Sequence, residues 1–350
     1  MFSAPSQPPW YQSPLMKAAR REPAERVPVW LMRQAGRYLT EYREIRRRMS
    51  FLELCKNPNL SAEVMLRTVE RLGVDAAILF SDLLLILEPM GMELEFTGDG
   101  GPSLRNAIRR PADVDRLGEL SNVDALEFVL ETVRKTRAGL DQELPLIGFA
   151  GAPFTLAAYA IEGGTSRDYR LTKTLMITEP GAWDALLSRL ARAVARYLNA
   201  QIDAGVQLVQ LFDSWVGCLG GDDYRRHVLP YTRRVIEAIT PGVPVIHFAT
   251  GNPALLPSLC EAGGTVIGID WRIRLDDAWR AIGYDRAIQG NLDPVVLLTS
   301  PAEIRRRAGE ILAQAGGRPG HIFNLGHGVL PQTPVENVLA LVEAVHDYSP

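Results

Sequence analysis

Short apolar runs alternate with long amphipathic stretches along almost the whole chain, and this alternation limits the folds that the chain can adopt. Such runs are typical of parallel strands buried on both faces, and the stretches between them have helical periodicity. We predict eight strands, at residues 29–32, 76–80, 146–150, 206–212, 245–248, 266–269, 287–289 and 322–324. Eight strand–helix repeats in one chain indicate an α/β fold of the (β/α)8, or TIM, barrel type.

An open, doubly wound parallel sheet is the alternative architecture for this pattern. It is disfavoured because no Gly-x-Gly-x-x-Gly motif follows the first predicted strand. The clearest helical periodicity lies at residues 62–72, 183–204, 224–239 and 335–345. One segment departs from the alternation, because residues 92–108 have the pattern of a β-hairpin with its turn at residues 97–102.

Length and composition fit a single large globular domain. The chain has 350 residues, of which 23% are charged, and its formal net charge is −3. We predict a flexible, proline-rich N-terminal arm at residues 1–13 and a barrel domain at residues 14–350. The charge gives no general attraction to nucleic acid or to an anionic membrane, and no apolar stretch is long enough to cross a bilayer. Three widely spaced cysteines suggest neither a disulfide framework nor a zinc site, so we predict a cytoplasmic protein.

The residues that follow the predicted strands are rich in Gly, Asp, Asn and His. These positions form the face on which barrel enzymes carry their active sites. Turns and helix caps favour the same residue types, so at any single position a structural role is the simpler interpretation. Taken over eight strands, the pattern supports the barrel more than it identifies a reaction.

Charged side chains follow the first two predicted strands. Arg33 and Arg37 flank a turn of small residues after the first strand, and arginine is suited to bidentate binding of carboxylates. Arg46 begins a run of three arginines, which is typical of a solvated helix face. Asp82 precedes the apolar residues 83–87, where it would either cap a helix or carry a perturbed pKa.

Three more polar side chains follow later strands. Tyr159 lies in an apolar run, where a tyrosine is usually a core residue. Ser214 has no histidine near it in the sequence that would indicate a nucleophilic triad, and His327 lies between two glycines. The sequence contains no His-Glu-x-x-His, Cys-x-x-Cys or P-loop motif, so we predict chemistry without a metal.

Two long motifs and several short ones resemble those of the uroporphyrinogen decarboxylase family. Trp-Leu-Met-Arg-Gln-Ala-Gly-Arg-Tyr at residues 30–38 resembles its N-terminal signature, and Gly-Phe-Ala-Gly-Ala-Pro-Phe-Thr at residues 148–155 resembles its second signature. Shorter segments resemble the family in the same order, at residues 80–82, 210–215, 289–294 and 324–328. The resemblance extends over about residues 14–348.

The resemblance implies a barrel-shaped homodimeric enzyme of haem biosynthesis. Such an enzyme removes CO2 from the four acetate side chains of uroporphyrinogen III, without a cofactor, and produces coproporphyrinogen III. The family's catalytic positions fall on Asp82, Arg33 and Arg37. Its substrate-binding positions fall on Arg33, Arg37, Arg46, Asp82, Ile86, Tyr159, Phe212, Ser214 and His327.

Two alternative functions are considered for a chain of this kind. Zinc- and corrinoid-dependent methyltransferases resemble this family and bind zinc through a His-x-Cys motif, but here the fifth strand ends His247-Phe248-Ala249. Alanine therefore stands where a zinc-binding thiolate would be required. A non-enzymatic tetrapyrrole carrier is the second alternative, and a carrier needs affinity but no aspartate beneath the pyrrole rings. Measuring turnover distinguishes the carrier from the enzyme.

Overall fold

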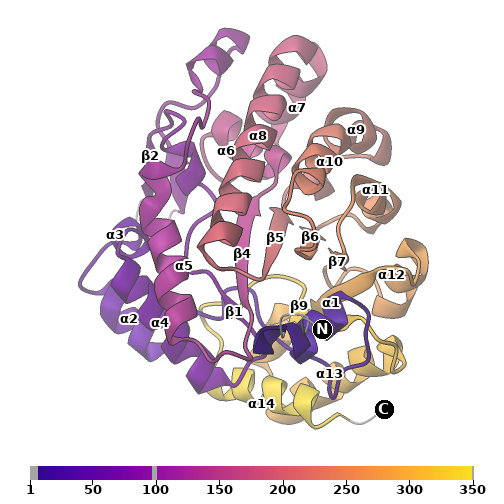
Figure 1. Cartoon of the computed structure of the whole chain (residues 1–350). Helices are drawn as coiled ribbons and strands as arrows, with labels where there is room; N and C mark the ends of the chain where they lie inside the picture. The colour runs from indigo at the N-terminus through magenta and orange to yellow at the C-terminus, as the bar shows by residue number, and fades with distance from the viewer. Residues whose placement is uncertain (1–6, 97–100, 349–350) are drawn as a thin grey trace, which may run out of the picture.

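The protein, described here from a computed structural model over residues 7–96 and 101–348, is built around one curled parallel sheet (Figure 1). Within the described residues this sheet has seven strands in chain order, and every neighbouring pair is parallel. The strands are β1 (Ala77–Ile78), β4 (Leu146–Gly151), β5 (Leu208–Asp213), β6 (Val245–Ala249), β7 (Val266–Gly268), β8 (Ala287–Leu292) and β9 (His321–Leu325). The predicted α/β barrel architecture is confirmed.

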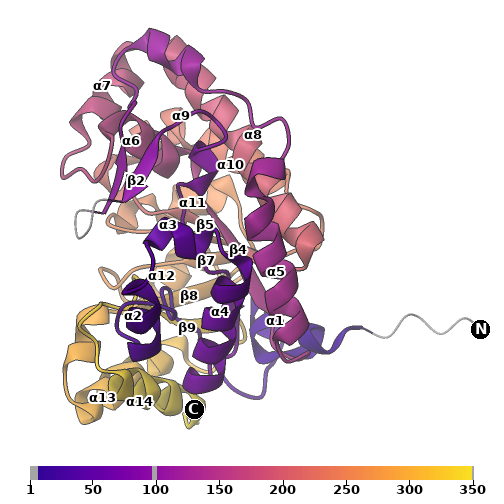
Figure 2. The same ribbon diagram turned by 90° about the vertical axis from the view of Figure 1, so that its left-hand side faces the viewer.

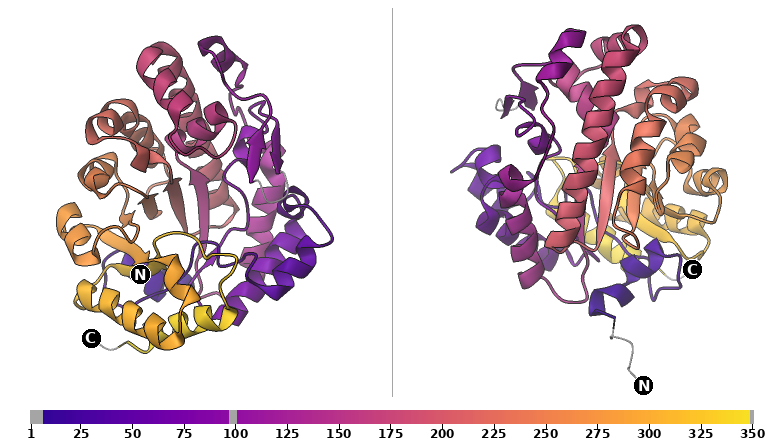
Figure 3. Two further views of the ribbon diagram at one scale, coloured as in Figure 1. Left: turned by 180° about the vertical axis from the view of Figure 1, so that it is seen from behind. Right: turned by 45° about the horizontal axis from the view of Figure 1, so that its top comes forward.

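Helices surround the sheet in both views of Figure 3. Those before β5 are α1 (Pro14–Ala19), α2 (Thr40–Arg46), α3 (Phe51–Cys55), α4 (Pro58–Leu72), α5 (Glu127–Gly139), α6 (Pro153–Glu162), α7 (Arg170–Thr178) and α8 (Pro180–Ala204). Those after β5 are α9 (Gly221–His227), α10 (Leu229–Glu237), α11 (Leu256–Ala262), α12 (Leu275–Ile282), α13 (Pro301–Ala315) and α14 (Val335–His346). The single helix predicted at residues 224–239 is wrong. It is divided at Val228, because Pro230 lacks the N–H group that would continue α9 and its ring would clash with the carbonyl four residues earlier.

The first predicted strand, residues 29–32, is reduced to one bridge residue. Val29 pairs in parallel with Phe323 of β9, and its carbonyl accepts a hydrogen bond from the Asp75 N–H at 2.8 Å. Three N–H groups of the segment donate to side chains and not to a strand, in the pairs Val29–Asp75, Leu31–Gln34 and Met32–Asn324. Side-chain acceptors have replaced the backbone hydrogen bonds that a strand would make. The bridge at Val29 still joins the two ends of the curled sheet, because it connects β9 with the segment before β1.

The barrel interior is packed at its amino-terminal end and capped by α1. The interior cluster combines four residues of α1 with strand residues at alternate positions, namely Leu15, Met16, Ala18, Ala19, Ala76, Ile147, Leu208, Ile246, Phe248, Val266, Ala287 and Ile322. Buried polar side chains form a further part of the interior: the Trp30 Nε1–H donates to Gln289 at 3.0 Å, and Gln289 donates to Gln210 at 3.0 Å. Figure 2 places α1 on the opposite side of the barrel from β2. The opposite, carboxyl end of the strands is therefore the end available for a site.

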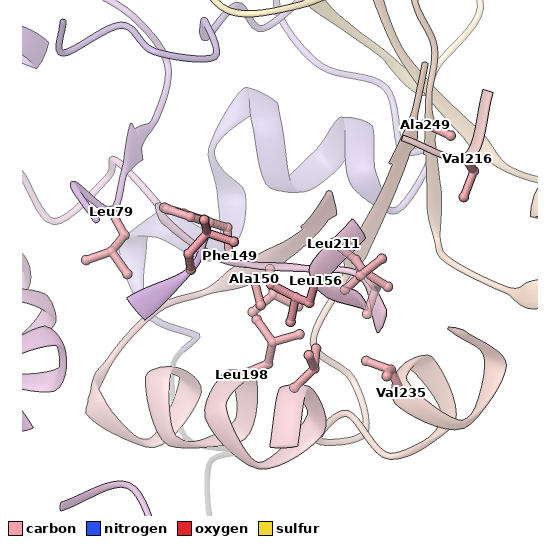
Figure 4. Close-up of a cluster of buried hydrophobic side chains, with 14 of the residues drawn as sticks. Leu79, Phe149, Ala150, Leu156, Leu198, Leu211, Val216, Val235 and Ala249 are labelled. Carbon is pink, nitrogen blue, oxygen red and sulfur yellow. The ribbon is translucent and has the colours of Figure 1, made fainter. Parts of the chain in front are cut away.

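A second, larger apolar cluster lies between the strands and the helices around them. Figure 4 shows part of it, where side chains from the strands meet those of α6, α8 and α10. The labelled residues are Leu79, Phe149, Ala150, Leu156, Leu198, Leu211, Val216, Val235 and Ala249. Each large aliphatic side chain buried in this way contributes roughly 1.5–3 kcal/mol, so this layer fixes where the strand ends lie.

The predicted hairpin is present as β2 (Leu94–Phe96) and β3 (Pro102–Leu104), which pair antiparallel. Most of its predicted turn, residues 97–100, lies outside the described residues. The predicted N-terminal arm is also described only in part: residues 1–6 lie outside, and Pro9–Gln12 form a short 3-10 helix. Trp10 of this helix packs against the interior cluster. Among the described helices, none combines the length and the apolar character that crossing a bilayer would require.

Candidate active site

Asp82 lies in the loop after β1, where the chain turns into a buried apolar segment. Its Oδ1 accepts a hydrogen bond from the Leu84 N–H at 2.9 Å, and a 3-10 helix, Leu85–Leu87, follows directly. Burial raises the pKa of Asp82 to about 6, although the Leu84 N–H group and the positive charge of Arg33 both act to lower it. The perturbed pKa that the sequence offered as one alternative is therefore present, whereas Leu84 and not Asp82 is the N-cap residue of the helix, which has no side-chain cap.

Arg33 approaches this aspartate from the turn that follows Val29. Its backbone has a φ of +62°, in the left-handed region, and its side chain packs against Gly328. A Cβ atom at position 328 would lie 2.7 Å from Arg33 Cγ, so only glycine allows the approach. The charge of Arg33 lowers the pKa values of Asp82, Tyr159 and His327, which places these four predicted site residues in one neighbourhood.

His327 is held as a neutral hydrogen-bond donor. Burial, reinforced by the charge of Arg33, lowers its pKa to about 4, and Asp270 opposes that effect. Its Nδ1 accepts a hydrogen bond from the Gly328 N–H at 2.8 Å, so the ring proton must be on Nε2. His327 therefore presents an N–H group, and not a positive charge, to a ligand.

Aromatic side chains occupy the part of the site next to β5. Tyr159 of α6 lies with its ring centroid 5.8 Å from that of Trp215, and burial and the nearby Asp82 raise its pKa to about 12. Phe212 is partly exposed and packs edge-on against Phe149 at 5.6 Å and Phe248 at 5.8 Å. Ser214 follows β5 and is half-buried, and its carbonyl accepts a hydrogen bond from the Thr250 hydroxyl at 2.8 Å.

The other predicted site residues lie around this centre. Arg46 donates a hydrogen bond to the Met49 carbonyl at 2.5 Å. Arg37 is exposed, and the charges of Arg46 and Arg37 partly oppose the increase that burial causes in the pKa of Tyr42. Ile86 is fully buried in the segment after Asp82 and supports that loop from the core. A substrate contact for Ile86 stays a prediction.

The comparison with known proteins decides the family. The model of the family "Uroporphyrinogen decarboxylase (URO-D)" matches residues 11–348. The chain belongs to the uroporphyrinogen decarboxylase family. A curated uroporphyrinogen decarboxylase of Sorangium cellulosum is 54% identical and covers 95% of both chains. Another of that name, from Carboxydothermus hydrogenoformans, is 52% identical over 95% of this chain and 96% of its own.

The fold of this family member is shared more widely than its sequence. A solved methyltransferase from Methanosarcina mazei is 21% identical, with a TM-score of 0.81 over 97% of this chain and 98% of its own. At that level of identity the likeness concerns the fold alone. Among the described residues, no group of three or more His, Cys, Asp or Glu side chains is arranged to hold a metal ion.

Two features of the site region were not predicted from the sequence. Asp213 and His247 are fully buried, with His247 Nε2 3.8 Å from Asp213 Oδ2, and the Thr155 hydroxyl donates to Asp213 at 3.3 Å. Ser214 follows Asp213 directly in the sequence, and Thr155 lies in the first turn of α6. The second feature is the turn of Asp270 and Arg272 after β7. Side-chain alternation along neighbouring strands could have paired the first group, but nothing in one sequence indicated Arg272.

Proposed function

We propose that this chain catalyses the decarboxylation of uroporphyrinogen III to coproporphyrinogen III, with Asp82 at the centre of the reaction. The observation that carries the proposal is a single carboxylate, at the carboxyl end of the barrel, whose pKa burial raises and the charge of Arg33 lowers. Around Asp82 lie an arginine and two neutral hydrogen-bond donors, Tyr159 and His327. Membership of the family supports the same reaction.

The substrate itself supplies the electron sink for this reaction. A proton adds to the α-carbon of one pyrrole ring, which makes that ring cationic. The bond between the acetate CH2 group and its carboxylate then breaks, CO2 leaves, and the electron pair neutralises the ring as an exocyclic methylene. A proton added to the methylene gives the methyl group, and loss of the α-proton restores the pyrrole.

Asp82 is assigned to stabilise the cationic ring. A carboxylate about 4 Å from a unit positive charge, at an effective dielectric near 20, interacts with it by about 4 kcal/mol before desolvation costs. The carboxylate must be ionised for this role, and a pKa of about 6 leaves Asp82 ionised at neutral pH. Its oxygens also accept hydrogen bonds from pyrrole N–H groups.

The remaining side chains are assigned to bind the substrate. Arg33 and Arg37 hold substrate carboxylates through bidentate contacts, and Arg46 adds a third positive charge on the same side. Neutral donors complete the binding set, through the hydroxyls of Tyr159 and Ser214 and the Nε2–H group of His327. Apolar contact with the macrocycle is assigned to Phe212 and Ile86.

The proposal extends to the state of the enzyme in the cell. We assign it as a cytoplasmic homodimer that needs neither a metal nor an organic cofactor, as the family resemblance implies. Size-exclusion chromatography with light scattering gives the oligomeric state directly. A mass of one chain at micromolar concentration would contradict the homodimer.

The experiment that tests the function is anaerobic incubation of the protein with uroporphyrinogen III. Chromatography of the oxidised porphyrins should show stepwise loss of carboxylates, from eight to four.

Asp82→Asn should lower kcat by two to three orders of magnitude, since it loses roughly 3–4 kcal/mol of charge stabilisation. Asp203→Asn, at an exposed position of α8, is the matched control and should behave as the wild type.

Two results would contradict the proposal. Porphyrin that binds but is recovered with all its carboxylates would identify the protein as a carrier. Uroporphyrinogen that is converted equally well by the wild type and by a folded Asp82→Asn variant would remove Asp82 from the reaction.

A further inference from the structure

The loop after β7 carries an arginine, Arg272, that is held in place by its own neighbours. Asp270 is 3% exposed, and its carboxylate accepts hydrogen bonds from the Gly251 N–H at 2.7 Å and from the Arg272 N–H at 2.9 Å. The same carboxylate accepts a hydrogen bond from Arg272 Nη1 at 2.5 Å. The guanidinium carbon lies 4.4 Å from the ring centroid of Trp271. One side of the guanidinium group is therefore anchored by an ion pair, and its face is supported by an aromatic ring.

This loop packs directly on the segment that carries His327. A Cβ atom at Gly326 would lie 2.7 Å from the backbone nitrogen of Trp271, so the two backbones touch. Gly328, on the other side of His327 in the sequence, is the residue that receives the Arg33 side chain. The Asp270–Trp271 backbone thus contacts one glycine beside His327 and the Arg33 side chain contacts the other, and the charges of Arg33 and Arg272 both act on the His327 ring.

The remaining donors of Arg272 are available for a ligand. Its side chain is 46% exposed, and within the described part of the chain its Nε and Nη2 groups have no hydrogen-bond partner. A guanidinium group already fixed by an ion pair and a ring loses less conformational entropy when it binds a ligand than a free side chain does. These donors suit a carboxylate ligand.

We propose that Arg272 is a further substrate-binding residue, which holds a peripheral carboxylate of the tetrapyrrole next to His327. The inference rests on the proposed function, because it takes uroporphyrinogen, with its eight carboxylates, as the ligand. Arg33, Arg37 and Arg46 all come from residues 33–46 and lie in one segment of the chain. Arg272 supplies a positive charge from the loop after β7, so the substrate would meet arginines from two separate segments of the chain.

The position of Arg272 also indicates which kind of carboxylate it binds. Asp82 follows β1 and Arg272 follows β7, and β4, β5 and β6 lie between these two strands in the sheet, so Arg272 lies away from Asp82 and the reacting ring. It therefore binds a side chain that the reaction leaves unchanged, such as a propionate. Loss of Arg272 should weaken substrate binding and should have little effect on the chemical step.

The test compares Arg272→Gln and Arg272→Lys with Arg274→Gln as the matched control. Arg274 lies two residues further along, is 62% exposed, and pairs with Asp276 and Asp277 outside the site. Two measurements are made on each variant: KM and kcat with uroporphyrinogen III, and the Kd for the stable oxidised porphyrin, uroporphyrin, by quenching of tryptophan fluorescence. We expect Arg272→Gln to raise KM and Kd about tenfold or more with kcat within threefold, because a bidentate charge-assisted contact is lost. Arg272→Lys should fall between, and Arg274→Gln should match the wild type.

A structural role for Arg272 predicts a different result. If the ion pair with Asp270 only supports the loop, Arg272→Gln lowers the melting temperature and kcat while KM and Kd stay within twofold of wild type, and the inference is overturned. The Kd also separates the two proposals. A wild type that binds uroporphyrin but converts no uroporphyrinogen refutes the proposed function, while the Kd of Arg272→Gln still decides the role of Arg272.

Discussion

Asp82 carries a negative charge in a buried environment that disfavours the ionised form of its carboxyl group. Burial raises its pKa to about 6, and only the Leu84 N–H group and Arg33 counter that increase. A carboxyl group in an unfolded chain has a pKa of about 3.9. The folded protein therefore binds the Asp82 proton more tightly than the unfolded chain does, and its stability decreases as the pH rises from about 4 to about 6. At neutral pH the full decrease in the free energy of unfolding from ionised Asp82 is present.

Asp82→Asn should consequently be more stable than the wild type at pH 7. The amide has no charge to bury, and its oxygen can still accept the Leu84 N–H group, so we expect a gain on the order of 1 kcal/mol. Thermal melts at pH 7 and pH 5 measure it, and the gain should shrink at pH 5 as the wild-type carboxyl becomes protonated. A variant that melts clearly below the wild type at pH 7 would indicate that Asp82 serves mainly as a structural cap.

His327 offers a second prediction at the scale of one residue, because its two ring nitrogens have different tasks. Glutamine places an N–H donor close to the position of Nε2, whereas alanine provides none. We expect His327→Ala to raise KM about tenfold, because the substrate carboxylate loses one hydrogen bond. His327→Gln keeps a donor, and its KM should stay within about threefold of wild type. Steady-state kinetics with uroporphyrinogen III make the comparison. Equal losses in both variants would show that the ring itself, and not its donor, is required.

Among the structural elements, the closure of the barrel depends on one carboxylate. Asp75 accepts hydrogen bonds from the Val29 N–H at 2.7 Å, from Arg26 at 2.6 Å and from His346 of α14 at 2.8 Å. Burial acts to raise the pKa of Asp75, but the hydrogen bonds from His346, Val29 and Arg26 outweigh it and lower the pKa. The carboxylate thus connects the bridge residue, the segment before β1 and the last helix.

Asp75→Asn should destabilise the fold by about 2 kcal/mol at pH 7, because it removes the buried charge that pairs with the half-exposed Arg26 and leaves donors unmatched. The stability from a lowered pKa is present above the unfolded value of about 3.9 and is lost as the pH falls through the folded value. Urea unfolding at pH 7 and at pH 3 measures the difference, which should become smaller only as the pH falls below about 4. Asp203→Asn is the exposed control, and a loss as small as that of the control would contradict the role of Asp75 in closure.

The sequence located the helices and strands whose backbone groups hydrogen-bond only within regular secondary structure. Apolar runs placed β4 to β9 to within a few residues, and periodicity placed α4, α8 and α14. The first strand was wrong because the N–H groups of Val29 and Met32 are satisfied by side chains from distant parts of the chain. Such long-range acceptors leave no periodic signal. The division between α9 and α10, in contrast, could have been predicted from Pro230.

At the scale of the whole molecule, the sequence could indicate only those candidate site residues that lie in single recognisable segments. The family motifs gave Asp82, Arg33, Tyr159 and His327, and the structure brings these four together. Asp213 and His247 lie on neighbouring strands, and side-chain alternation along those strands could have paired them. The position of Arg272 depends on a backbone contact between two loops, which no single segment encodes.

Across the described part of the barrel, no group of three or more His, Cys, Asp or Glu side chains is arranged to hold a metal ion. In the proposed reaction, the protonated pyrrole of the substrate accepts the electrons that a cofactor would otherwise accept. We therefore predict that exhaustive dialysis against a chelator such as EDTA leaves kcat and KM for uroporphyrinogen III within twofold of their original values. Elemental analysis before and after dialysis is the control, because it shows whether a bound metal was removed. Loss of turnover together with a stoichiometric metal, and recovery when that metal is returned, would show that the reaction needs more than these side chains.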